Sequence, residues 1–382
     1  MNILVAPDKF RGSLEADEVC DAIREGILLA FPEANVTTVP LADGGEGTAQ
    51  ILTKQAGGVS ITTRATDPLG REMEASYGLS ADRKVAFIEM AAASGLKLLK
   101  TSERNPTLTT TFGTGELILD ALDKGVTKII LGIGGSATTD GGIGVAAALG
   151  YRFFDKNNAQ LAPIGESLSL ITHIDTTNAD PRLKDISIEV ACDVTNPLFG
   201  QNGAAYIYGP QKGATPEMVE TLDNGLRNLA RMATETFHED YSEIPGAGAA
   251  GGLGAGCMWF LNATLKDGVS IVVEQSNITE LIKNADLVIT GEGKIDEQTL
   301  SGKVVKGLAN HCKQYNVPLA AVCGTLQITS EQGREAGITY AVSVLNRPMD
   351  LETAQTEAFG LVRDATFQLV RLFFQQTRSD NS

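Results

Sequence analysis

Side chains that could do chemistry gather in short glycine-rich segments, each of which follows an apolar run. The segment "APDKFRGSL" places Asp8, Arg11 and Ser13 directly after the strand-like run "NILV". A carboxylate, a guanidinium and a hydroxyl so close together suit a small anionic substrate, because arginine can hold a carboxylate through two parallel hydrogen bonds. The other interpretation is a solvated loop between a strand and a helix, with Ser13 as the helix N-cap.

The segment "LGIGGSATTDGGIG", residues 131–144, is rich in glycine and stands between the apolar run "KIIL" and the helix-like run "VAAALG". Backbone N–H groups and hydroxyls at a helix N-terminus bind anions, so this loop is a candidate phosphate site. Asp140 within it either caps the helix or holds a Mg²⁺ ion whose other ligands are phosphate oxygens. The candidate phosphate-binding residues are Gly134, Gly135, Ser136, Ala137 and Thr138.

Four further segments combine glycine with acids, amides or cations. Taken singly, each would also fit a solvated loop. Together they favour phosphoryl transfer, because cations and glycine N–H groups bind anionic oxygens, while carboxylates bind Mg²⁺ or accept a proton. The segments are "LADGGEGT" with Asp43, Gly44 and Gly45, "ACDVTNPLFG" with Asp193 and Asn196, "GPQKGA" with Gln211 and Lys212, and "ITGEGKIDEQTLSGK" with Glu292, Lys294 and Asp296.

Familiar nucleotide motifs are absent or out of place. No GxxxxGK[ST] segment occurs, which excludes a P-loop, and the protein-kinase signature set is missing too. The segment "GAGAAG", residues 246–251, matches the dinucleotide fingerprint GxGxxG but follows Pro245 rather than a strand. We therefore expect these glycines to let a helix start pack closely, or to offer N–H groups to an anion.

The composition limits the partners and the compartment. The chain has 382 residues and a formal net charge of −16, which argues against nucleic acid because binding its phosphates needs clustered Lys and Arg. Five cysteines without a CxxC pair argue against disulfides and zinc and for a reducing cytoplasm. The apolar runs are too short to span a membrane, so we expect a cytoplasmic protein. Whether it is a monomer or a homodimer stays open.

The elements that must position these segments alternate between strand and helix at both ends of the chain. Residues 59–90 instead alternate apolar and polar residues in the manner of antiparallel strands. We therefore predict an α/β protein of two domains. One is a discontinuous Rossmann-like or flavodoxin-like parallel-sheet domain of residues 1–62 and 285–382, and the other is an inserted mixed α/β domain of residues 63–284. Ligands bind at the carboxyl ends of strands in such sheets, which is where "APDKF", "LADGGEG" and "ITGEGKID" lie.

These segments, in this order, closely resemble the bacterial glycerate kinase family of type 1, which phosphorylates the 2-hydroxyl group. The resemblance extends from the first strand to about residue 325 and includes "IEMAAASGL", "TFGTGELILDAL" and "PGAGAAGGLGAG". It implies ATP- and Mg²⁺-dependent conversion of D-glycerate to 2-phosphoglycerate in a two-domain α/β structure. Lys9, Thr139 and Lys294 stand where the family usually has a small hydroxyl residue, asparagine and arginine.

Position at strand ends, together with this resemblance, gives each residue a hypothetical role. Arg11 and Ser13 hold the carboxylate of glycerate, while Asp193 orients the 2-hydroxyl and accepts its proton; the carboxylates could exchange these roles. The catalytic set is Asp193, Arg11 and Asp8. The substrate set is Arg11, Ser13, Asp43, Gly44, Gly45 and Asn196. ATP is assigned to residues 134–138 with Gln211, Lys212 and Lys294, and Mg²⁺ to Asp140, Glu292 and Asp296.

Three other functions stay open at this point. Glycerate could be phosphorylated at the 3-hydroxyl. A nicotinamide-dependent 2-hydroxy-acid dehydrogenase would need a GxGxxG directly after a strand, which the chain lacks. A non-catalytic glycerate sensor that represses a pathway would need a basic DNA-binding segment, which the sequence does not show.

Overall fold

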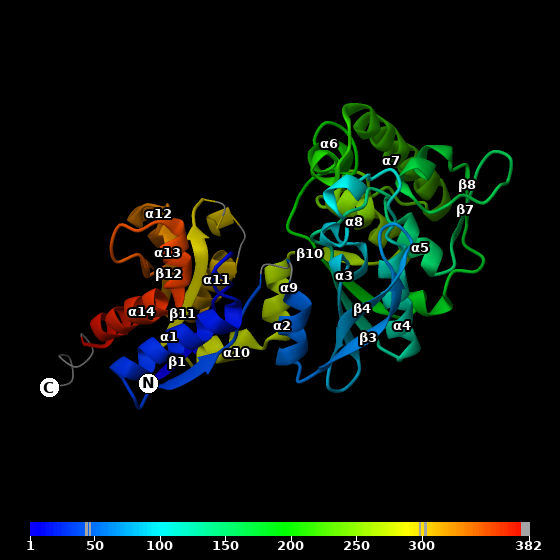
Figure 1. Ribbon diagram of the computed structural model, residues 1–382. Coiled ribbons are helices and arrows are strands. Elements are labelled where there is room, and N and C mark those ends of the chain that lie inside the picture. Colours follow the sequence, from blue (N-terminus) through cyan, green and yellow to red (C-terminus); the bar gives the residue numbers. More distant parts are fainter. Residues whose placement is uncertain (43–44, 46, 298, 302–303, 376–382) are drawn as a thin grey trace. The chain divides into compact units, whose positions relative to one another are not determined.

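The computed structural model describes residues 1–42, 45, 47–297, 299–301 and 304–375. The chain forms two compact units, Met1–Asp43 with Val269–Ser382 (unit 1) and Gly44–Gly268 (unit 2). Both are α/β, and the prediction of that fold class is confirmed (Figure 1). The two junctions follow residues 43 and 268, whereas the predicted domains change after residues 62 and 284; as a statement about domains, those ranges stay a prediction.

Unit 1 is built on a five-stranded sheet in which every strand pair is parallel. Its central strands are buried over most of their length, as expected for a parallel sheet that helices cover on both faces. The strand order is β13-β12-β11-β1-β2, so the segment after β1 and the segment at the end of β11 emerge side by side. The strands are β1 (Asn2–Val5), β2 (Asn35–Thr38), β11 (Leu287–Ile295), β12 (Leu319–Leu326) and β13 (Tyr340–Ser343).

Helices α1 (Ala16–Ala30) and α14 (Ala358–Gln375) pack directly on each other in unit 1. Their close approach needs Gly26, since a Cβ there would lie 2.3 Å from the Arg363 carbonyl oxygen. Ser13 is not the N-cap of α1, as one interpretation had it, because Glu15 and Glu18 form a capping box instead. The remaining helices are α9 (Gly268–Gln275), α10 (Ile278–Lys283), α11 (Val304–Tyr315), α12 (Ser330–Glu335) and α13 (Leu351–Thr356), with the 3₁₀ turn η6 (Thr299–Ser301).

Unit 2 contains a six-stranded mixed sheet in the order β10-β9-β6-β5-β4-β3. Strands β5, β6, β9 and β10 are parallel to one another, and β4 pairs antiparallel with both β5 and β3. The antiparallel pattern expected for residues 59–90 is therefore correct for β3 and β4. The strands are β3 (Val59–Thr66), β4 (Glu72–Leu79), β5 (Val85–Glu89), β6 (Lys128–Gly132), β9 (Ser187–Ala191) and β10 (Thr264–Lys266).

The longest helix of unit 2, α7 (Pro216–Phe237), starts with Thr215 as N-cap and proline at its first position, which are favourable residues at those places. A separate antiparallel pair, β7 (Arg152–Phe154) and β8 (His173–Asp175), lies outside the main sheet. The other helices are α2 (Thr48–Gln55), α3 (Ala91–Ser94), α4 (Phe112–Asp123), α5 (Ile143–Ala148), α6 (Ala204–Tyr208) and α8 (Ala249–Leu261). The 3₁₀ turns are η1 (Leu96–Leu98), η2 (Thr101–Glu103), η3 (Gly165–Leu170), η4 (Pro181–Lys184) and η5 (Pro210–Lys212).

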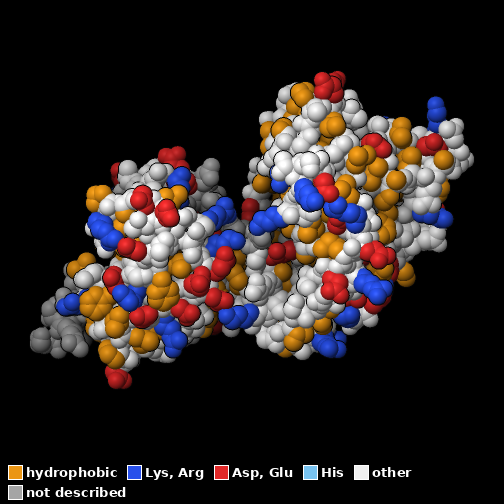
Figure 2. Space-filling model, in the orientation of Figure 1, with side chains coloured by type: hydrophobic (Ala, Val, Ile, Leu, Met, Phe, Trp, Pro, Cys, Tyr) orange, Lys and Arg blue, Asp and Glu red, His pale blue; other side chains and the backbone are white. Residues whose placement is uncertain are grey.

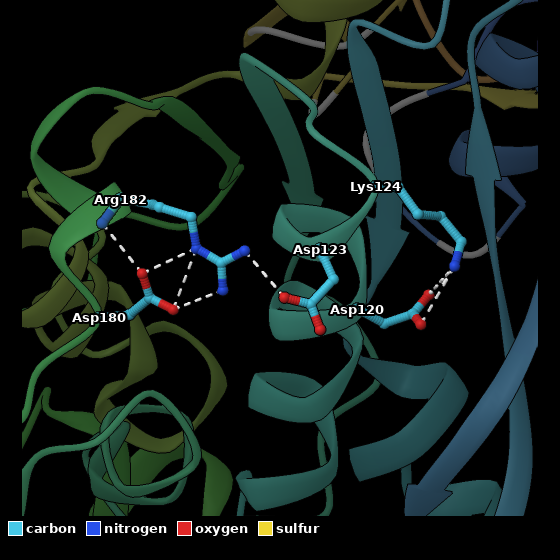
Figure 3. Close-up of polar contacts among 5 residues, drawn as sticks. All are labelled: Asp120, Asp123, Lys124, Asp180 and Arg182. Atoms are coloured by element: carbon cyan, nitrogen blue, oxygen red, sulfur yellow. Dashed lines mark hydrogen bonds and ion pairs between the residues drawn. The ribbon is translucent and has the colours of Figure 1, made fainter.

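An arginine ties two of these elements together across the surface (Figure 3). Arg182 in η4 contacts the Asp180 carboxylate at 2.6 Å and the Asp123 carboxylate, at the end of α4, at 2.8 Å. On the other side of α4, Lys124 pairs with Asp120 at 3.1 Å. Exposed pairs of this kind contribute about 0–1 kcal/mol each, so they orient the elements rather than hold the fold.

Acidic and basic side chains are interspersed over the visible faces of both units (Figure 2). Within the described ranges, no helix has the length and apolar character that a bilayer crossing requires.

Candidate functional site

In unit 1, the loop after β1 lies against the end of β11. The backbone N–H of Asp8 donates to the Gly291 carbonyl at 2.8 Å, which extends the pairing beyond β1 itself. A Cβ on Gly293 would lie 3.3 Å from the Arg11 nitrogen, so the two loops are in direct contact. Segments almost three hundred residues apart in the sequence thus meet at one sheet edge. This meeting brings Asp8 and Arg11 next to the segment that carries Glu292.

The acids at this edge differ in exposure and in their contacts. Asp8 and Glu292 are both 7% exposed, and the Asp8 carboxylate accepts a hydrogen bond from the Lys9 N–H at 2.7 Å. Asp296 pairs with the exposed ammonium of Lys294 at 2.8 Å, and its carboxylate also accepts from the Thr299 N–H at 3.2 Å. Glu292 and Asp296 are the predicted Mg²⁺ ligands of this unit. A hydrated Mg²⁺ ion takes most of its ligands from water and phosphate, so one or two carboxylates are enough.

Ser13 and Asp43 are also predicted to bind the substrate. The Ser13 hydroxyl donates to the Phe10 carbonyl at 3.0 Å, so it closes the turn of its own loop. Asp43, like Gly44 of the same segment, lies outside the described residues.

In unit 2, the parallel strands β5, β6 and β9 end at a common edge, where two glycine loops approach each other. A Cβ on Gly134 would lie 3.8 Å from the Cα of Gly45, so the segment before α2 lies near the loop after β6. Glu89, the last residue of β5, fastens the start of α2, since its Oε1 accepts from the N–H groups of Gly47 at 2.8 Å and Ala49 at 3.0 Å. Glu89 lies in the segment "IEMAAASGL" but is not among the predicted site residues, because a single acid at the end of an apolar strand gives no chemical signal of its own.

Asp193 follows β9 and is exposed to solvent. Its Oδ1 accepts a hydrogen bond from the Gly268 N–H at 2.8 Å, which joins the ends of β9 and β10. The neighbouring thiol of Cys192 is largely inside the protein, and that burial raises its pKa. Asp193 is therefore a solvent-accessible carboxylate held by the backbone, and it could accept a proton from a hydroxyl group.

Asn196 is already engaged at both ends of its side-chain amide. Its Nδ2 donates to the Asn202 carbonyl at 2.8 Å, and its Oδ1 accepts from the Tyr208 hydroxyl at 2.6 Å. These contacts support a role in shaping the loop after β9.

The loop after β6 is exposed only in part. Gly134 and Gly135 are exposed, whereas the next three residues are buried; Ser136 is 9% exposed and Thr138 is fully buried. The Ala137 N–H donates to the Ser94 carbonyl at 2.9 Å, so this part of the loop is pinned to the segment after β5. The surface that an anion can reach is therefore the backbone of Gly134 and Gly135, where the latter has φ +74°.

Asp140 is fully buried and surrounded by donors. Its Oδ2 accepts from the N–H and hydroxyl of Thr111 at 2.7 and 2.8 Å and from the Gly144 N–H at 3.2 Å, and its Oδ1 accepts from the Gly142 N–H at 3.2 Å. Burial raises the pKa of this carboxyl, although the four donors oppose that shift. The sequence left two roles open for Asp140, a helix cap or a Mg²⁺ ligand. These contacts at the start of α5 support the cap.

Lys212 is 1% exposed, and its ammonium donates to the Thr138 carbonyl at 2.5 Å. Burial lowers its pKa to about 7, while the charge of Asp140 acts in the opposite direction. Lys212 thus holds the buried part of the loop after β6 through the Thr138 carbonyl. The neighbouring Gln211 is exposed, so a ligand can reach its side chain.

The glycines of residues 246–256 are there for packing. A Cβ on Gly251 would lie 2.0 Å from the Thr138 carbonyl oxygen, and one on Gly256 would lie 2.4 Å from that of Gly141. Helix α8 can approach the loop after β6 only because these residues lack side chains. The close-packing expectation for "GAGAAG" is correct.

Within the described ranges, no group of three or more Asp, Glu, His or Cys side chains is arranged to hold a metal ion. Of the predicted Mg²⁺ ligands, Glu292 and Asp296 remain candidates, since a Mg²⁺ ion needs only one or two protein carboxylates when phosphate supplies the rest.

Comparison with known proteins decides the family. The model of the glycerate kinase family matches residues 3–374. The chain belongs to the glycerate kinase family. A glycerate kinase of Halalkalibacterium halodurans is 47% identical over 95% of this chain and 96% of its own length. The glycerate 2-kinase of Escherichia coli K12 is 48% identical over 94% of both chains. The resemblance seen in the motifs is confirmed.

The fold of this glycerate kinase family member is similar to that of a solved relative. A crystal structure of a Salmonella typhimurium LT2 protein, assigned as a glycerate kinase 2, superimposes with a TM-score of 0.90 at 44% identity and covers 99% of both chains. The shared family and fold support reading the two loop-bearing sheet edges as parts of a kinase. Neither the family nor these relatives support a dehydrogenase.

Proposed function

We propose that this protein transfers the γ-phosphoryl group of ATP to the 2-hydroxyl of D-glycerate, which yields 2-phosphoglycerate and ADP. The observation that carries the proposal is the family match over residues 3–374, and the name of the Escherichia coli relative, glycerate 2-kinase, supports the 2-position. We also propose the predicted arrangement of a discontinuous Rossmann-like domain with an inserted mixed domain. The enzyme would act on small molecules in the cytoplasm as a monomer or homodimer, with no nucleic acid partner.

The substrate roles rest on charge and exposure. Arg11 is an exposed guanidinium beside Asp8 and would bind the glycerate carboxylate through two N–H groups. In unit 2, the exposed backbone of Gly134 and Gly135, with Gln211, would bind ATP phosphates. In unit 1, Lys294 stays a predicted ATP ligand, and its ammonium is exposed. Lys212 would act by holding the Thr138 carbonyl rather than by touching phosphate. Glu292 and Asp296 would hold the Mg²⁺ ion that screens the phosphate charge.

The proton of the 2-hydroxyl would pass to Asp193. Its side chain is exposed to solvent, and the Gly268 N–H orients its carboxylate through Oδ1. Acceptance of this proton lets the hydroxyl oxygen form its bond to phosphorus as the bond between phosphorus and ADP breaks.

The reaction is tested by measuring ADP release with purified protein, ATP, Mg²⁺ and D-glycerate, and by identifying the product with ³¹P NMR. We expect a resonance of 2-phosphoglycerate. A product that carries phosphate on the 3-hydroxyl would contradict the position, and ADP release that does not depend on glycerate would contradict the substrate. Added NAD should change nothing, since the chain lacks a strand-linked dinucleotide motif.

The role of Asp193 is tested with Asp193→Asn, because the amide oxygen can still accept from the Gly268 N–H while the group can no longer take a proton. We expect kcat to fall by about 10²–10⁴-fold with little change in either KM. Asp185→Asn, an exposed acid just before β9, serves as the control and should keep full activity. A kcat for Asp193→Asn within about tenfold of the parent would exclude Asp193 as the base.

A further inference from the structure

Arg104 is a half-buried arginine in unit 2 with an unsatisfied hydrogen-bond donor. It follows η2 and lies seven residues before Thr111, which binds Asp140. Its Nε is buried and has no hydrogen-bond partner among the residues that the structure describes. The acid next to it in the sequence is already engaged, since the Glu103 carboxylate accepts from Arg71 at 2.8 Å and from the Lys100 N–H at 2.9 Å.

An arginine in this condition is uncommon in a chain so rich in acids. The chain has 47 Asp and Glu residues against 31 Lys and Arg residues. Other partly buried arginines pair with acids: Arg152 contacts Asp175 at 2.6 Å and Arg182 contacts Asp180 at 2.6 Å. A guanidinium keeps its charge in proteins, and leaving a charged N–H buried without an acceptor destabilises the fold. Such groups in native structures generally indicate a bound water, ion or ligand, or a functional role.

The place of Arg104 favours a ligand of the candidate site. A Cβ on Gly213 would lie 2.3 Å from the Arg104 carbonyl oxygen, so the Arg104 backbone packs directly on the turn that carries Gln211 and Lys212. Lys212 in turn holds the Thr138 carbonyl of the glycine loop.

The segment from Arg104 to Thr111 also contacts the loop after β6 directly. The Thr109 hydroxyl donates to the Ala137 carbonyl at 3.1 Å. Arg104 therefore stands on a segment that packs on the turn of Gln211 and Lys212 and is hydrogen-bonded to Ala137, just after the exposed Gly134 and Gly135.

We propose that Arg104 binds an oxyanion of a substrate, through the planar fork of its guanidinium, and so acts as a binding residue of the phosphoryl-transfer site. The ligand class is a carboxylate or phosphate group, because both match this fork with two parallel hydrogen bonds. In the proposed reaction these groups belong to glycerate and to ATP, and the inference rests on that function.

The test compares Arg104→Met and Arg104→Lys with the parent enzyme in steady-state kinetics, with each substrate varied in turn. We expect Arg104→Met to raise the KM of one substrate by about tenfold to a hundredfold while the other KM changes little, since a charge-assisted hydrogen bond is lost on one side only. Arg104→Lys keeps the charge but not the fork and should recover part of the loss. A KM increase for glycerate identifies the carboxylate, and one for ATP identifies the phosphates.

Arg231→Met is the matched control, because Arg231 is exposed and pairs with surface groups at Glu235 and Asn228. It should leave both KM values unchanged. Calorimetric titration of the resting protein with D-glycerate, and separately with inorganic tripolyphosphate, measures binding without turnover. This measurement separates the inference from the proposed function. If the parent protein neither binds these ligands nor turns over substrate, the proposed function itself is wrong.

The inference is overturned if Arg104→Met, folded as judged by circular dichroism and thermal unfolding, keeps both KM values and both titrations within about twofold of the parent. Equal losses for both ligands, with a lowered unfolding temperature, would likewise reassign Arg104 to the structure of its loop.

Discussion

At the scale of single residues, burial decides what a polar side chain can do. Asp140 and Lys212 come from segments that look like binding loops, yet both are buried and bonded within the protein. Asp193 and Arg11 come from segments of the same appearance and face solvent. The first pair therefore shapes the loop after β6, and the second pair has the exposure that the proposed substrate roles require.

Arg11→Ala tests the carboxylate-binding role. Loss of a charge-assisted contact should raise the KM of D-glycerate by about tenfold or more, while the KM of ATP stays within about threefold. The readout is ADP release with each substrate varied. Arg24→Ala, an exposed arginine on α1, is the control. A KM change confined to ATP would move Arg11 to the nucleotide.

Lys212→Met tests the buried ammonium through the pH dependence of stability. The pKa of Lys212 is about 7 in the folded protein against an ordinary value of 10.5, so between these values the unfolded chain binds a proton that the folded chain lacks. Stability should therefore rise with pH over this window, by at most about 1.4 kcal/mol per pH unit from this group.

The variant should lose this part of the slope, which urea unfolding at pH 7 and pH 9 would detect. Asp140 is the charged group that opposes the shift, and it is unchanged in the variant. Lys184→Met, which removes an exposed ammonium, should keep the parental slope. Parallel pH profiles for the parent and Lys212→Met would show that Lys212 is not titrating in this range.

At the scale of elements, glycines decide how closely a helix and a loop approach. Helix α8 packs on the loop after β6 through Gly251, which has φ +71°, and through Gly256. The run that carries them resembles a nucleotide motif in sequence. In the structure it is the packing surface that allows Thr138 and Gly141 to lie where they do.

Gly251→Ala should lower the stability of the protein by about 2 kcal/mol or more. The new methyl group meets a carbonyl oxygen, and the left-handed backbone conformation is unfavourable for alanine. Gly360→Ala is the control, since a Cβ in that part of α14 meets nothing within 4 Å and should be neutral or stabilising. Thermal unfolding measures both; a Gly251→Ala midpoint equal to that of the parent would contradict the packing argument.

At the scale of the whole molecule, the sheets bring together segments that are far apart in the sequence. The pairing of β1 with β11 places the loop after residue 5 beside the segment of residues 291–296, and β5, β6 and β9 place three further segments at one edge. The alternation of strand and helix predicts these sheets, because apolar runs and helix-like faces are local properties. The strand order is not local, since it depends on which apolar faces pack together.

The sequence by itself determined the fold class, the family and the segments that carry the chemistry, because glycine spacing, charge and apolar periodicity are all visible in the chain. Only the tertiary structure decided which members of those segments are accessible. It buried Asp140 and Lys212, engaged both ends of Asn196, assigned Glu89 to the start of α2 and left Arg104 with an unsatisfied donor. The reason is that exposure and hydrogen bonding depend on what packs over a residue, and those neighbours come from distant parts of the chain.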